Sequence, residues 1–141
     1  MVFDDYYTIE VGKAKLIEEG KDVTIVTYGM GVHWSKDVMD KLSNYSADII
    51  DLRTLQPWDK DAVRSSLEKT NKILIVHEDS ITGGIGAEIS AWITENCFSH
   101  LDGPVMRVGG LDTPIPFRKE LEENFMPSGR IEKTLINLLE Y

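Results

Sequence analysis

His77, Glu78 and Asp79 form the group of side chains in this sequence that is best suited to chemistry. They follow the apolar run at 73–76 and precede a glycine-rich bend at 83–86, a pattern that predicts a strand, a tight turn and then a helix. In open α/β sheets, sites are usually built at the carboxyl ends of the strands. An imidazole beside two carboxylates could transfer protons, and two adjacent carboxylates could bind a cation or raise each other's pKa.

The geometry of a strand weakens the case for catalysis by these three residues alone. Neighbouring strand residues point to opposite faces of a sheet, so His77 and Glu78 need not converge. No second cluster in the sequence supplies further metal ligands, and no metal site is predicted. A hydrogen-bonded loop end is therefore the better interpretation, and the trio is kept as a possible loop site.

Two glycine pairs match part of the dinucleotide-binding pattern G-x-G-x-x-G. Residues 29–31 and 84–86 each lie between an expected strand and an expected helix, and Asp48 follows the first pair after about 20 residues. The third glycine position is filled by Trp34 in one case and Ile89 in the other. Both side chains are too large for the close approach of a helix and a diphosphate, so the glycines are predicted only to allow tight turns.

The remaining reactive side chains are isolated. A single cysteine, Cys97, permits no internal disulfide and no cysteine-based zinc cluster, and its apolar helical surroundings predict a buried structural thiol. His33 and His100 are interpreted as surface or cap residues. The sequence contains no G-x-S-x-G, P-loop or H-E-x-x-H motif.

The composition excludes several classes of partner. The 141 residues carry a formal net charge of −9, which argues against a nucleic-acid or anionic-membrane surface and favours a basic protein partner. No apolar run approaches the roughly 18 residues that a membrane span needs, and the amino terminus has no signal-peptide profile. A reducing, cytoplasmic location is the default expectation.

Hydrophobic periodicity predicts a domain in which strands and helices alternate. Two short strands at 14–18 and 22–27 are expected to form an antiparallel hairpin, because only Glu19-Gly20-Lys21 connects them. The further expected strands are 47–53, 73–76 and 105–108, and the expected helices are 32–45, one that starts at 57–59, 84–98 and 129–140. Asp59 and Ser128 are the expected helix caps, and a loop with three prolines precedes the last helix.

Strands that are joined by helical crossovers run parallel to one another. The predicted fold class is therefore a three-layer α/β domain whose sheet has about five strands, mostly parallel, with one antiparallel edge strand. It is expected to cover residues 13–141, after a linker-like lead-in at 1–12.

Several stretches together resemble the C-terminal domain of the β subunit, or β half of a fused chain, of thiamine-diphosphate-dependent 2-oxo acid dehydrogenases. They lie in the family's order and spacing along nearly the whole chain. The stretches are GKA at 12–14, GKDVTIVTYG at 20–29, DLRTLQPWD at 51–59, HED at 77–79, TGG at 82–84, GAEI at 86–89 and RVGGLDTPIPF at 107–117. The sequence VHED followed by TGG looks more like branched-chain (2-oxoisovalerate) enzymes than pyruvate enzymes.

This resemblance implies a transketolase C-terminal-like fold and a place in an oxidoreductase. Enzymes of the family decarboxylate a 2-oxo acid on thiamine diphosphate and pass the acyl group to a lipoyl arm of the acyltransferase core. The cofactor and Mg²⁺ are held by two other domains, whose Gly-Asp-Gly motif and activating glutamate have no counterpart here. The chain alone is therefore expected to bind no thiamine diphosphate and to be inactive, and Met1-Val2 before a linker-like segment suggests a piece of a longer protein.

The resemblance also implies partners. The family's domain dimerises with a second copy, contacts other domains and subunits of the same enzyme, and docks the basic peripheral-subunit-binding domain of the core. The acidic residue implicated in docking falls on Asp102, and the terminal carboxylate implicated with it falls on Tyr141. A helix-exit turn before Gly103-Pro104 is an alternative role for Asp102.

Two other functions stay open from the sequence. One is the C-terminal domain of another transketolase-like enzyme, which would share the fold. The other is a free-standing Rossmann-like nucleotide-binding domain, which a thermal-shift screen with nucleotides would reveal.

Overall fold

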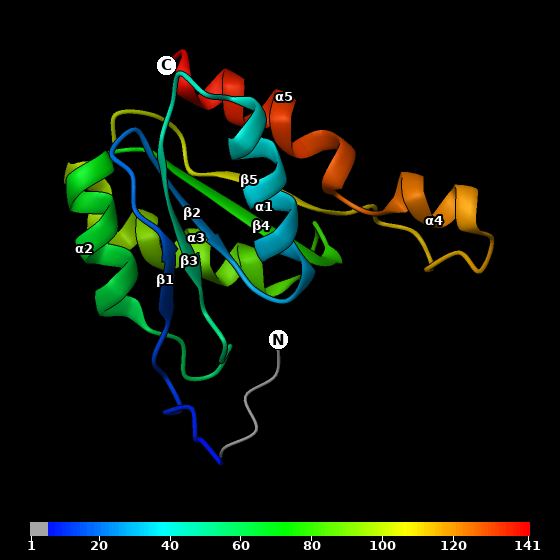
Figure 1. Cartoon of the computed structure of the whole chain (residues 1–141), viewed down its shortest axis with the longest axis horizontal. Helices are drawn as coiled ribbons and strands as arrows, with labels where there is room; N and C mark the ends of the chain where they lie inside the picture. Colours follow the sequence, from blue (N-terminus) through cyan, green and yellow to red (C-terminus); the bar gives the residue numbers. More distant parts are fainter. Residues whose placement is uncertain (1–5) are drawn as a thin grey trace.

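The computed structural model describes residues 6–141 and places them around a five-stranded sheet with the order β1-β3-β2-β4-β5 (Figure 1). The strands are β1 (Lys15–Glu18), β2 (Val23–Thr27), β3 (Ala47–Asp51), β4 (Ile73–Ser80) and β5 (Met106–Gly110). The last four run parallel, while β1 is antiparallel to β3 at one edge. The predicted fold class is confirmed.

Helices cover both faces of the sheet and make the three layers (Figure 1). One face is covered by α1 (Met30–Lys41) and α5 (Ser128–Leu139), and the other by α2 (Lys60–Thr70) and α3 (Ile85–Cys97), which a 3-10 turn at Phe98–His100 extends. Along β4, Leu74 and Val76 pack into the first core, whereas Ile73 and Ile75 pack into the second. This double burial explains why the strand is continuously apolar.

The predicted hairpin of the first two strands is wrong in its pairing. The two strands do run in opposite directions, but β3 lies between them. The connection crosses the start of β3, where the Asp22 amide donates to the Ser46 carbonyl over 3.0 Å. A Cβ on Gly20 would lie 2.2 Å from the Ala47 nitrogen. The short connection thus makes β2 run opposite to β1, and Gly20 lets this connection pass over β3, which lies between them.

The start of α2 agrees with the predicted cap. The Asp59 carboxylate accepts a hydrogen bond from the Ala62 amide over 3.1 Å. Trp58 and Val63 are both buried, as expected for side chains that pack together across a helix start. At the other end, Asn71 adopts the left-handed conformation that ends many helices (φ 58°).

The predicted Ser128 cap is wrong, because Ser128 is the first residue of α5 and Pro127 precedes it as the cap without a side-chain hydrogen bond. The first helix also begins earlier than predicted, at Met30, because Gly29 turns the chain with a positive φ of 58°. Within residues 6–141, none of the helices combines the length and the apolar character that crossing a membrane would require.

A short helix, α4 (Lys119–Phe125), lies where the sequence predicted only a proline-rich loop. It belongs to an arm, residues 111–126, that projects from the body of the molecule (Figure 1). The base of the arm is fixed because Phe125 is buried against Gly110, where an added Cβ would lie 2.9 Å from the ring. Further out, Phe117 is fully exposed. The charged run at 118–123 therefore forms a helix with little contact to the core.

Candidate functional site

The order of the sheet reverses between β2 and β4. After β2 the chain crosses through α1 to β3 on one side, and after β4 it crosses through α3 to β5 on the other. Ligands of open α/β sheets bind beside the carboxyl ends of the strands at such a reversal. Tyr28 follows β2 there, and His77, Glu78 and Asp79 form the end of β4. The predicted loop site thus lies where this fold favours a site.

His77 is completely buried among glycines. Cβ atoms added to Gly84, Gly86 and Gly109 would lie 3.1, 2.3 and 2.7 Å from atoms of the imidazole ring. Within residues 6–141, neither ring nitrogen has a hydrogen-bond partner. Burial lowers the pKa of His77, and the nearby Asp79 carboxylate offsets this only in part. The ring is therefore neutral at pH 7 and is shielded from any substrate at the surface.

The two carboxylates of the trio separate as the strand period requires. The side chain of Asp79 lies on the same face of the sheet as the ring of His77, because a Cβ added to Gly84 would lie 3.1 Å from both. No hydrogen bond joins these two side chains. Asp79 is exposed and Glu78 partly so. Burial raises the pKa of Tyr28, and the charges of Asp79 and Glu78 raise it further. In the described part of the chain, no three His, Cys, Asp or Glu residues are placed to hold a metal ion.

His77 makes stability depend on pH in a defined window. Its pKa is lowered in the folded state, so the unfolded chain takes up a proton first as the pH falls below about 6.5. We expect the free energy of unfolding to be constant above that pH and to fall by up to about 1.4 kcal/mol per pH unit below it. Urea unfolding followed by circular dichroism between pH 7.5 and 5.5 measures this slope.

The variant His77→Leu should lose this slope, whatever its stability at pH 7.5. The matched control His33→Gln removes an exposed histidine from α1 and should keep the slope. A slope that survives in His77→Leu would show that another group titrates.

The two residues predicted to bind a partner lie at the opposite end of the sheet. Asp102 is exposed, and its amide donates to the Asn71 carbonyl over 2.8 Å just before β4 begins. At Gly103, an added Cβ would lie 3.4 Å from the Cβ of Tyr141, whose side chain is 76% exposed. The turn that contains Asp102 and Gly103 therefore lies against the end of the described chain at Tyr141, although the two are far apart in the sequence. Neither is near His77.

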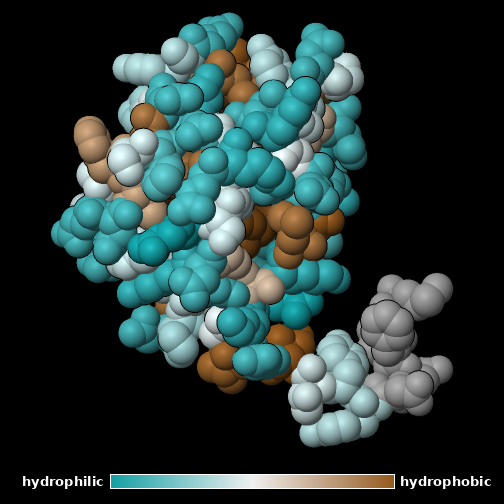
Figure 2. Space-filling view, turned by 90° about the vertical axis from the view of Figure 1, so that its left-hand side faces the viewer, coloured by the Kyte–Doolittle hydropathy of each residue, from teal (hydrophilic) through white to brown (hydrophobic). Residues whose placement is uncertain are grey.

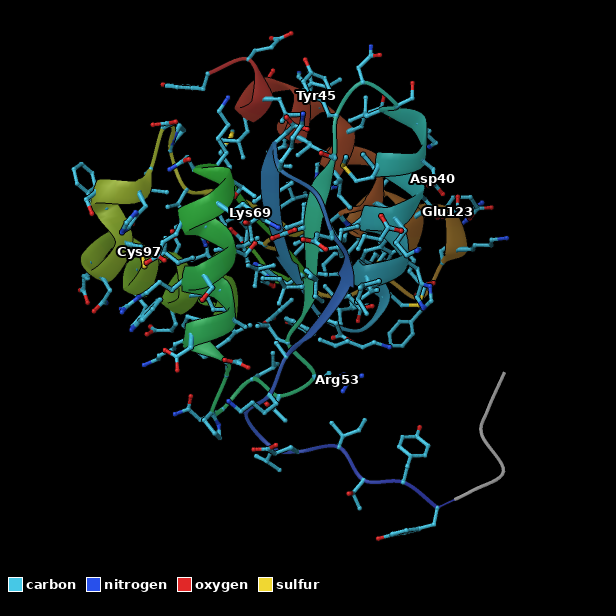
Figure 3. The ribbon with its side chains drawn as sticks, turned by 60° about the vertical axis from the view of Figure 1, so that its left-hand side comes forward. Asp40, Tyr45, Arg53, Lys69, Cys97 and Glu123 are labelled. Atoms are coloured by element: carbon cyan, nitrogen blue, oxygen red, sulfur yellow. The ribbon has the colours of Figure 1, made fainter. Side chains whose placement is uncertain are left out.

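Asp48 has a structural position that the sequence analysis missed, since it was considered only as part of a nucleotide motif. Its buried carboxylate accepts hydrogen bonds from the Ser66 hydroxyl, the Lys69 ammonium and the Gly20 amide, over 2.6, 2.7 and 2.9 Å. Burial alone would raise the pKa of Asp48, but these hydrogen bonds outweigh it and hold the pKa below the usual value. Figure 3 shows Lys69 extending from α2 toward the edge of the sheet.

The Asp48 network continues inward through hydroxyl groups. Thr24 contacts Ser66 and Thr70 over 2.6 and 2.7 Å, so the hydroxyls of these three residues all have a partner. A groove of about 310 Å³ opens beside it between β1 and α2, on a side of the molecule that is mostly hydrophilic (Figure 2). Polar residues at buried strand positions, here Thr24 and Asp48, are the signal that could have revealed the network. Because its groups satisfy one another, we interpret it as structural.

The sheet order, the two helix layers and the order of the quoted stretches along the chain are consistent with one family. The sequence profile described as "Transketolase, C-terminal domain" matches residues 12–130. The chain belongs to this family. The resemblance stated from the sequence is thereby confirmed at the level of the domain.

Relatives of this transketolase C-terminal domain include β subunits of 2-oxo acid dehydrogenases. It is 45% identical over 113 residues to the mitochondrial "2-oxoisovalerate dehydrogenase subunit beta" of Dictyostelium discoideum, covering 78% of this chain and 30% of that protein. It is 38% identical to the subunit of the same name from Bacillus subtilis, covering 97% and 43%. A pyruvate dehydrogenase β subunit of rice is 39% identical, covering 89% and 34%. The chain thus spans less than half the length of these relatives.

A solved structure supports the same assignment. The "Split gene transketolase, inactive beta4 tetramer" superposes with a TM-score of 0.80 at 25% identity, covering 99% of this chain and 45% of that one. The similarity extends over almost every residue of this chain, so the fold includes β1 and the arm as parts of the family's domain.

Proposed function

We propose that the chain acts as the C-terminal assembly and docking domain of the β component of a thiamine-dependent 2-oxo acid dehydrogenase. The observation that supports this proposal is that Gly103, the neighbour of Asp102, lies against Tyr141, since a Cβ added to Gly103 would lie 3.4 Å from the Cβ of Tyr141. Asp102 and Tyr141 are the two residues expected to bind the acyltransferase core. The names of the relatives favour a branched-chain 2-oxo acid over pyruvate as substrate. Other subunits of the enzyme and a second copy of this domain are the further proposed partners.

The surroundings of Asp102 suit a docking surface. The turn is fixed by the Asp102 amide, and the end of α5 is fixed by Lys72, whose ammonium donates to the Leu139 carbonyl over 2.9 Å. The acidic side chain is therefore presented on a rigid support. A basic partner would be attracted by the net charge of −9 and oriented by this carboxylate.

We propose that thiamine diphosphate and Mg²⁺ are bound outside this chain. At the reversal of the sheet, the carboxylates of Glu78 and Asp79 would repel a diphosphate, and the nearby guanidinium of Arg107 already donates to the Ile81 carbonyl. The buried ring of His77 cannot reach a ligand there. These residues do not fit the cofactor, so the decarboxylation is assigned to other domains of the enzyme. A cytoplasmic location also stays a proposal, because bacterial and mitochondrial relatives both occur.

The variant Asp102→Ala should weaken docking in the assembled enzyme. We expect a roughly tenfold higher dissociation constant for the peripheral-subunit-binding domain, since one charge-assisted contact is lost. The dependence of affinity on salt should also become shallower. Surface plasmon resonance at several NaCl concentrations measures both quantities.

Glu123→Ala is the matched control for this experiment. Glu123 is an exposed carboxylate on α4, far from the C-terminus (Figures 1 and 3). This variant removes the same charge and should leave docking almost unchanged. Equal affinity of Asp102→Ala and the unmodified enzyme at low and high salt would remove Asp102 from the docking surface.

A further inference from the structure

A small pocket that the proposed function does not use lies between β5 and α5, where the chain leaves the body for the arm (Figure 1). Its volume is about 150 Å³. The lining includes Ile81, Arg107, Gly109, Gly110, Arg130 and Thr134. Among the described residues that line it, the charged ones are the two arginines, in a chain whose net charge is strongly negative.

Both guanidinium groups are held by backbone carbonyls. Arg107 donates to the Ile81 carbonyl over 2.8 Å. Arg130 donates to the carbonyls of Asn124, Gly109 and Phe125 over 3.0, 2.7 and 3.1 Å. These contacts fix the orientation of both groups. Each guanidinium has five N–H donors, so donors remain for a further acceptor.

Neither arginine is paired directly with a carboxylate in the described part of the chain, although the charge of Arg107 contributes to lowering the pKa of the nearby Asp112. Within residues 6–141, no ion pair includes Arg107 or Arg130, although both side chains are partly buried. The nearby Asp112 directs both carboxylate oxygens to Thr82, over 2.9 and 2.6 Å. Carbonyl dipoles compensate a cation only in part. Two partly desolvated positive charges around one pocket therefore favour an anion between them.

We propose that this pocket binds a small oxyanion, either a carboxylate or a phosphate, between Arg107 and Arg130. Arginine forks match the planar or tetrahedral oxygens of both groups. The volume is below that of sites for drug-sized ligands, so the pocket fits a small anionic group. The glycines at 109 and 110 leave backbone rather than side chains along one wall. This inference does not depend on the proposed function.

The test is a titration of the chain, followed by ¹H–¹⁵N correlation spectra. Sodium phosphate and sodium acetate are added in separate series, with NaCl adjusted to keep the ionic strength constant. We expect saturable shifts of the amides of Ile81, Gly109 and Gly110 in at least one series. The series with the lower dissociation constant identifies the class of oxyanion.

The variant Arg107→Gln should raise that dissociation constant about tenfold, and Arg107→Lys should raise it less, because the charge remains. Arg107→Gln loses one hydrogen bond, to the Ile81 carbonyl, and the charge that acts on Asp112, so the fold is expected to persist, which its spectrum reports directly. Arg118→Gln, which removes an exposed arginine paired with Glu120, should bind like the unmodified chain.

Non-saturable shifts in both series would overturn the proposal. Equal affinities for the unmodified chain and a folded Arg107→Gln would also overturn it.

Discussion

Replacing Gly20 by alanine should lower the free energy of unfolding by about 3 kcal/mol, near the upper end of what overpacking normally costs. The added Cβ would lie 2.2 Å from the nitrogen of Ala47 and 2.5 Å from the carbonyl carbon of Ser46. These contacts are backbone atoms, so no side chain can rotate away. The strain must instead separate the β1–β2 connection from β3.

Urea unfolding followed by far-ultraviolet circular dichroism measures this effect. Gly129→Ala is the matched control, because an added Cβ there meets nothing within 4 Å and Gly129 lies in α5. A small gain, at most about 1 kcal/mol, is expected for that helical position. Equal unfolding midpoints of the two variants would show that the connection does not pass over β3 as described.

The second large effect is expected for Asp48→Ala. This change removes the acceptor of the Ser66 hydroxyl, the Lys69 ammonium and the Gly20 amide at once. Removing one partner of a buried charged pair costs about 3–5 kcal/mol, and partial exposure of Lys69 places the expected loss at about 3 kcal/mol. The Asp48→Asn variant keeps the shape and one acceptor oxygen and should lose less.

Asp51→Ala is the control for Asp48. Asp51 lies on the same strand, but from residues 6–141 its carboxylate accepts only the hydrogen bond of the exposed Arg53 amide, over 3.1 Å. A loss below about 1 kcal/mol is expected for a contact of that kind. If both alanine variants unfold at the same urea concentration, the Asp48 network contributes no more to the free energy of unfolding than the exposed contact of Asp51.

The sequence was sufficient to predict the parallel part of the sheet and its two helix layers. Runs such as 73–76 are apolar at every position, and the helices between them have one apolar side, so burial on both faces follows from pattern alone. The pairing of β1 could not be predicted in this way. A three-residue connection fixes direction, whereas the neighbour of an edge strand depends on which faces remain free after the other strands assemble.

The same limit applies to α4. Its stability depends on the burial of Phe125 against Gly110 and on Arg130, which donates to carbonyls at its end. These contacts join residues that no local periodicity connects. A charged run between prolines therefore predicts a loop, although tertiary contacts make it a helix.

For the candidate sites, the sequence predicted where residues lie in the fold better than what their side chains do. The strand period correctly separates Glu78 from His77, but it gives no sign that three glycines enclose the imidazole. The docking role of Asp102 and Tyr141 was expected from a resemblance, and the structure adds that Gly103, next to Asp102, packs against Leu138 and Tyr141 at the end of α5. The pocket between Arg107 and Arg130 has no sequence signal, because its residues come from separate elements.

The central claim is that this domain assembles an enzyme whose chemistry takes place in other domains. The most direct test is the decarboxylation of 2-oxoisovalerate, assayed with thiamine diphosphate and Mg²⁺ in three samples. The first is this chain alone, and the second is the Bacillus subtilis enzyme whose β subunit lacks the 43% that this chain covers. In the third, this chain replaces that missing part.

Turnover is predicted in the third sample only. Turnover by the 141 residues alone would contradict the claim, as would a hybrid β subunit that joins its partner subunit and remains inactive.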